Sequence, residues 1–79
     1  MDYKKVLEKA KEINKNLLAT DKRFNQTTEL IMEDDSIFLI QNSFYQKIDD
    51  YIVLFSEHYP VQVHHKDDVY CFYGYKKHI

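Results

Sequence analysis

The chain has 79 residues, one cysteine, one glycine, one proline and a formal net charge of −2. This length predicts one domain, residues 1–79, and the lone cysteine excludes an internal disulfide. No stretch is long and apolar enough to cross a bilayer, and no signal-like apolar segment precedes the first charged helix. We therefore expect a cytoplasmic protein.

Apolar residues recur at helical spacing in the first part of the chain, which predicts a helix within residues 1–20. Asp2 is placed to cap its first turn, and the helix should end near Ala19. The apolar stripe consists of Val6, Leu7, Ala10, Ile13, Leu17 and Leu18. We expect this stripe to pack on a sheet, because lysines and glutamates occupy the other side of the helix.

Beyond residue 24 the pattern changes to short blocks of Ile, Val, Phe and Tyr, which predicts an antiparallel sheet over residues 27–75. Acidic pairs and the Tyr59-Pro60 step separate the blocks and favour turns. The predicted strands are 27–32, 37–41 continuing through 44–48, 51–57, 61–65 and 69–75. Asn42-Ser43 is either a bulge or a break that splits the second segment into two strands. Residues 67–77 have a helical alternative capped by Asp67, but their Tyr, Phe and Val content and Gly74 favour a strand.

These elements predict an α+β fold, with the N-terminal helix packed on one face of a curved antiparallel β-meander of four to five strands. A tight hairpin at Tyr59-Pro60 would place Leu54 opposite His65, and a second hairpin at 66–68 would place Val63 opposite Cys71. One sheet face, away from the helix, then carries Tyr51, Val53, Phe55, Tyr70 and Phe72. A slip of one residue would exchange the two faces.

This aromatic face is the main functional signal, because monomers rarely expose a wide apolar patch. Coiling of the sheet could bury these aromatic rings within the chain. The hypothesis that we favour is that the rings contact another protein or a second copy of the chain. The hypothesis is a non-enzymatic protein-interaction module, for example a small acidic inhibitor of phage or mobile-element origin acting on a host protein. The candidate binding residues are Tyr51, Phe55, Tyr70 and Phe72 as anchors, with Asp34, Asp35 and Asp50 as a charged rim.

The alternative function is nucleic-acid binding through the lysine-rich helix. Residues 1–23 carry a net charge of +3, whereas residues 24–79 carry −5. Glu8 and Glu12 interrupt the lysines, however, and Arg23 is the only arginine. We therefore expect a protein rather than nucleic acid as the partner, and no contact with a membrane.

Metal binding and catalysis have weaker support. His58, His64 and His65 lie close together in the sequence, but the predicted strand sends His64 and His65 to opposite faces, and no zinc-type spacing occurs. Cys71 is expected to be a buried apolar residue without a neighbouring base. A single glycine excludes a phosphate-binding loop. We expect no metal, no cofactor and no catalytic residues, and thus not an enzyme.

Overall fold

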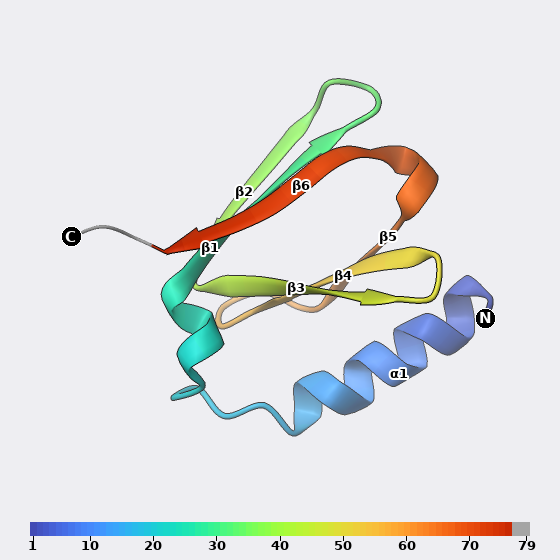
Figure 1. Ribbon diagram of the computed structural model, residues 1–79. Coiled ribbons are helices and arrows are strands. Elements are labelled where there is room, and N and C mark those ends of the chain that lie inside the picture. Colours follow the sequence, from blue (N-terminus) through green and yellow to red (C-terminus); the bar gives the residue numbers. More distant parts are fainter. Residues whose placement is uncertain (77–79) are drawn as a thin grey trace.

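A helix and two antiparallel sheets lie in three layers in the computed structural model, which describes residues 1–76 (Figure 1). The elements are α1 (Tyr3–Lys15), β1 (Gln26–Met32), β2 (Ile37–Gln41), β3 (Ser43–Ile48), β4 (Tyr51–Ser56), β5 (Gln62–His65) and β6 (Val69–Lys76), with 3₁₀ turns η1 (Lys22–Asn25) and η2 (Lys66–Asp68). The middle layer has strand order β3-β4-β5, and the outer layer has order β2-β1-β6. The α+β fold with an N-terminal helix on antiparallel sheet is confirmed, with six strands in two sheets rather than four to five in one.

Helix α1 begins as predicted and ends earlier than predicted. The Asp2 side chain accepts a hydrogen bond from the Lys5 amide at 2.9 Å, which satisfies one of the free amides of the first turn. The helix ends at Lys15 rather than near Ala19, because Asn16 caps it and donates its side-chain amide to the Glu12 carbonyl at 3.1 Å. Within the described residues, no helix has the length and apolar content needed to span a membrane.

The helix packs on the middle sheet. Val6 and Ala10 are fully buried at this contact, and the side chains that complete it come mainly from β3 and β4. The cluster consists of Val6, Ala10, Phe24, Phe44, Ile48, Val53 and Phe55, with Ile13, Leu17, Tyr51, Val61 and Val63 at its edge. Four residues of the predicted stripe therefore do cover a sheet face, namely Val6, Ala10, Ile13 and Leu17, whereas Leu18 is exposed.

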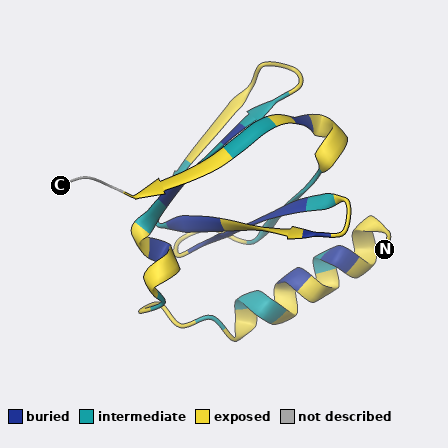
Figure 2. Cartoon of the chain, in the orientation of Figure 1, coloured by how far each residue is buried: buried dark blue, intermediate teal, exposed yellow. Residues whose placement is uncertain are grey.

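A second cluster lies between the two sheets. Leu30 of β1 meets Ile52 and Leu54 of β4, and Val69 closes the cluster at the start of β6. Strand β4 is buried along nearly its whole length, since its alternate side chains face the helix on one side and the outer sheet on the other (Figure 2). β4 is thus the central strand of the molecule.

The predicted register between β4 and β5 is wrong by three residues. His65 lies opposite Tyr51 instead of Leu54, and Val63 lies opposite Val53. The connection is wider than a tight hairpin, and the Ser56 hydroxyl organises it by hydrogen bonding both the amide and the carbonyl of Tyr59 at 3.1 Å. Because three is odd, Tyr51, Val53 and Phe55 share the helix-side face with Val61 and Val63, in place of the predicted Ile52 and Leu54.

The predicted hairpin between β5 and β6 is also wrong. Turn η2 leads the chain away from β5, and β6 pairs with β1, so that Phe72 lies opposite Leu30 and Cys71 opposite Ile31. A bulge at Ile31/Met32 interrupts this ladder. Residues 69–76 form a strand, which confirms the prediction of a strand rather than a helix for this segment. Residue 77 lies outside the described residues.

Candidate protein-interaction surface

The four predicted aromatic anchors do not share an exposed face. Phe55 is 0% exposed beneath α1, and Tyr51 is half-buried beside it, with its ring 6.1 Å from that of Tyr3. Phe72 points between the sheets and packs edge-on against Tyr45 at 4.9 Å. Only Tyr70, at the bulge of β6, is strongly exposed, at 71%. The prediction of a single aromatic face is therefore wrong, because it depended on the register that the structure corrects.

The predicted acidic rim is divided between two turns. Asp34 and Asp35 lie in the β1–β2 turn, where Asp35 has a positive φ of 69° and the Asp34 carboxylate accepts the Ser36 amide at 3.0 Å. Hydrogen bonds from Ser36 hold the pKa of Asp34 below its usual value. Asp50 lies instead in the β3–β4 turn of the other sheet. The three carboxylates therefore do not border the same surface layer.

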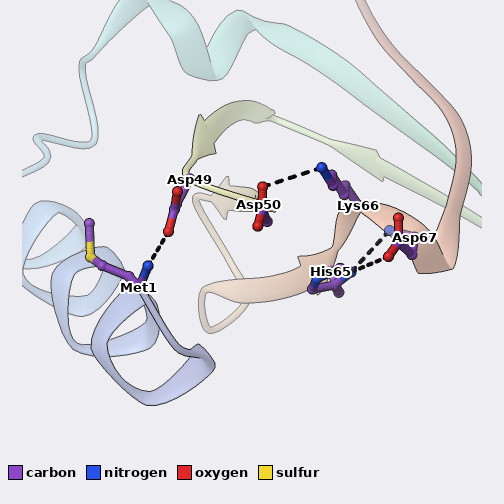
Figure 3. Close-up of polar contacts among 6 residues, drawn as sticks. All are labelled: Met1, Asp49, Asp50, His65, Lys66 and Asp67. Carbon is purple, nitrogen blue, oxygen red and sulfur yellow. Dashed lines mark hydrogen bonds and ion pairs between the residues drawn. The ribbon is translucent and has the colours of Figure 1, made fainter.

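Polar contacts join the β3–β4 turn to neighbouring elements (Figure 3). The Asp49 carboxylate binds the amino group of Met1, and the Asp50 carboxylate lies 3.3 Å from the Lys66 ammonium. The Asp50 carbonyl also accepts the Lys66 amide at 2.8 Å. Asp50 thus has a structural role, because it holds η2 beside the turn. The side chains of this Asp50–Lys66 ion pair are both exposed.

An apolar surface that the sequence interpretation missed lies on the side of the β2-β1-β6 sheet that faces away from β4. We call it the outer face. Register and strand alternation place nine side chains on it: Thr27, Glu29, Ile31, Ile37, Leu39, Gln41, Cys71, Tyr73 and Tyr75. They form three rows across the sheet, with Glu29, Leu39 and Tyr73 in the middle row.

Large apolar groups on the outer face are open to solvent. Ile37 is 61% exposed and Leu39 is 56% exposed, and Figure 2 shows β2 as a mainly exposed strand at the edge of the outer sheet. Tyr73 and Tyr75 are each 44% exposed, with ring centres 6.2 Å apart. Helix α1 packs on the far side of the middle sheet, so it does not cover this face (Figure 1). The molecule therefore presents a contiguous apolar sheet surface.

One charged side chain lies in the middle of the outer face. Glu29 is half-buried on β1 between Leu39 and Tyr73, and it accepts a hydrogen bond from the Tyr73 hydroxyl. No cationic side chain occupies the outward positions of β1, β2 and β6 in residues 26–76. The face thus combines apolar contact area with a negative charge at its centre.

A visible sequence signal could have identified this face. The block Ile37-Phe38-Leu39-Ile40 is apolar at both odd and even positions, and residues 69–73 show the same property. A strand that is apolar on both sides needs cover on both sides. In this protein the inner side of β2 and β6 is covered by β4, but the outer side is not.

His64, His65 and Cys71 lie in three separate environments. His64 faces the outer sheet, contacts Gln62 at 3.1 Å and packs against Phe38, whereas His65 accepts the Asp67 amide at 3.1 Å. Cys71 is half-buried on the outer face, opposite Ile31 rather than the expected Val63. Across residues 1–76, no three His, Cys, Asp or Glu side chains converge as ligands for a metal ion.

A shallow hollow of about 350 Å³ lies at the end of the outer sheet nearest the β1–β2 turn. Its lining consists of Met32, Glu33, Asp34, Ser36, Phe38, His64 and Asp68. The Glu33 amide donates to the Asp68 carbonyl at 3.0 Å, which joins this turn to η2. Because Met32 and Phe38 face the middle sheet, this hollow opens between the two sheets and is not part of the outer face.

Comparison with known proteins gives no family or relative from which a function could be transferred. No protein-family model, no curated protein and no solved structure matches the chain at a significant level.

Proposed function

We propose that the protein is a non-enzymatic interaction module that binds another protein through the outer face. The observation that carries this proposal is the exposure of Ile37 and Leu39, at 61% and 56%, on a sheet surface without a covering layer. Soluble monomers seldom leave contiguous apolar area of this kind open unless a partner covers it. Tyrosines, which are enriched at protein interfaces, border the same surface at Tyr73 and Tyr75.

Two further features support a binding role. The face belongs to a hydrogen-bonded sheet that is held from behind by Leu30, Ile52 and Leu54, so it is a rigid platform rather than a mobile loop. Its free thiol, Cys71, is compatible with a reducing compartment, and we propose the cytoplasm as the location. An acidic inhibitor of a host protein remains one concrete form of this function.

The test is capture of a partner from a lysate of the source cell by the immobilised full chain and its Leu39→Gln variant. We expect wild type to retain a discrete protein that the variant loses, because the amide would be desolvated within the contact. Glutamine is chosen since a carboxylate at this position would lie opposite Glu29. Leu18→Gln is the matched control, because Leu18 is equally apolar and 71% exposed on another part of the molecule.

Two results would contradict the proposal. One is capture of the same protein by both wild type and Leu39→Gln, which would place the contact elsewhere. The other is retention of nucleic acid alone, with binding that weakens steeply as salt increases, which would favour phosphate contacts by the lysines of α1.

A further inference from the structure

The outer face imposes a chemical requirement on whatever covers it. Glu29 lies in the middle row, and its one described hydrogen-bond partner is the neutral hydroxyl of Tyr73. A partner that covers Leu39 and Tyr73 also removes water from this carboxylate. Burial of a carboxylate is unfavourable unless a cation or several donors replace the water. The occupant must therefore bring a positive charge or additional donors to Glu29.

A second copy of the chain does not meet this requirement. Two outer faces packed together would bury two Glu29 carboxylates in the same interface. The outward positions among the described residues supply no cation to pair with them. Between backbone positions, the rows from Thr27 to Ile31 span about 13 Å along the strands and about 10 Å across them, which is about the width of one helix or of two adjacent strands.

We propose that the outer face binds a short amphipathic segment of another protein, in which apolar residues flank a Lys or Arg that pairs with Glu29. This inference rests on the proposed function and specifies the chemistry of the partner. The footprint fits one extended strand or one helix face. Further basic residues in the segment would lie toward the β1–β2 turn, where Asp34 and Asp35 add negative charge.

The experiment is selection from a displayed library of short random peptides against the immobilised full chain, followed by calorimetric titration of the selected peptides. We expect Lys or Arg to be enriched among Ile, Leu, Val, Phe and Tyr in the selected sequences. Glu29→Gln should weaken their binding about 30-fold, the cost of removing one partner of a desolvated charge pair. Glutamine can still accept the Tyr73 hydroxyl, and Glu8→Gln on α1 is the matched control, which should bind as wild type does.

The outcomes separate this inference from the proposed function. If Leu39→Gln abolishes binding but the peptides lack basic residues and bind Glu29→Gln equally well, the inference is wrong and the proposed function stands. If binding survives Leu39→Gln, both are wrong. If no peptide is selected, the inference is also wrong. A dimer detected by sedimentation and dissociated by Leu39→Gln would then identify a second copy as the occupant.

Discussion

The Thr28 side chain has an unusual environment for a hydroxyl. It is 1% exposed on the inner side of β1, and its oxygen has no hydrogen-bond partner among the described residues. A buried polar group without a partner costs roughly 1–3 kcal/mol, and valine has almost the same shape. We expect Thr28→Val to increase the free energy of unfolding by about 1 kcal/mol, measured by urea denaturation. A decrease would show that the hydroxyl is satisfied in the folded protein.

His64 should make stability depend on pH. Burial lowers the pKa of His64 below 6.5, and the charge of Asp68 opposes this shift to a smaller extent. The unfolded chain therefore binds the proton more tightly than the folded chain, so stability should fall as pH decreases below 6.5 and level off below the folded pKa.

His64→Gln should flatten this dependence of the unfolding temperature between about pH 7.5 and about pH 5. His58→Gln, which changes an exposed histidine in the β4–β5 loop, is the control and should keep the slope. An unchanged slope in His64→Gln would assign the pH effect to another group.

Asn42 determines how the chain passes from the outer sheet to the middle sheet. It is the single residue between β2 and β3, and its φ is 54°. The Ser43 hydroxyl donates to the Ile40 carbonyl at 2.6 Å, and the Asn42 carbonyl accepts the Glu57 amide at 3.1 Å. The split of this segment, one of two alternatives left open by the sequence, follows from this left-handed residue.

Substitutions at Asn42 should reflect its backbone conformation. Glycine adopts a positive φ readily, so Asn42→Gly should be close to neutral. Asn42→Val should lower the free energy of unfolding by about 1–2 kcal/mol, because a β-branched residue is strained in this region. Urea denaturation of both variants is the measurement, and equal stability would contradict the role of this residue.

The two aromatic residues Phe55 and Tyr70 should differ sharply in their contribution to stability. Phe55→Ala removes a fully buried ring between β4 and α1 and should cost about 3–5 kcal/mol. Tyr70→Ala changes an exposed side chain and should stay within about 0.5 kcal/mol of wild type. Comparable losses in the two variants, measured by thermal or urea unfolding, would contradict the corrected register.

The boundaries of the strands could be predicted from the sequence, whereas their pairing could not. Local signals such as the Asp-containing turns and the Asp2 cap determine where elements begin. The pairing of β6 with β1 joins residues that are far apart in the chain, such as Phe72 and Leu30, and no local pattern specifies it. The β4–β5 register depends on the length of a loop that Ser56 organises, and a tight turn at Tyr59-Pro60 was the wrong assumption.

The candidate site shows the same division between local and long-range information. The excess of apolar and aromatic residues was visible in the composition, and an exposed apolar surface does exist. Its location depended on sheet pairing, so the predicted anchors Phe55 and Phe72 lie inside and Ile37 and Leu39 lie outside. The three-residue shift of β5 against β4 accounts for Phe55, and the pairing of β6 with β1 accounts for Phe72.

Taken as a whole, the molecule has two different external sides. Helix α1, whose lysines are exposed, lies on one side of the middle sheet, and the outer sheet with the acidic β1–β2 turn lies on the other side (Figure 1). The middle sheet separates them. This arrangement favours approach of a basic, apolar partner to the outer face, since Glu29 and the carboxylates of the β1–β2 turn lie there and the lysines of α1 are remote.

The most direct test is a map of amide chemical-shift changes in the isotope-labelled protein on titration with a selected peptide. We expect the changes to concentrate in β1, β2 and β6, at Glu29, Ile37, Leu39 and Tyr73, while the amide signals of α1 keep their positions. Changes confined to α1 or to the β4–β5 loop would contradict the assignment of the outer face as the binding surface.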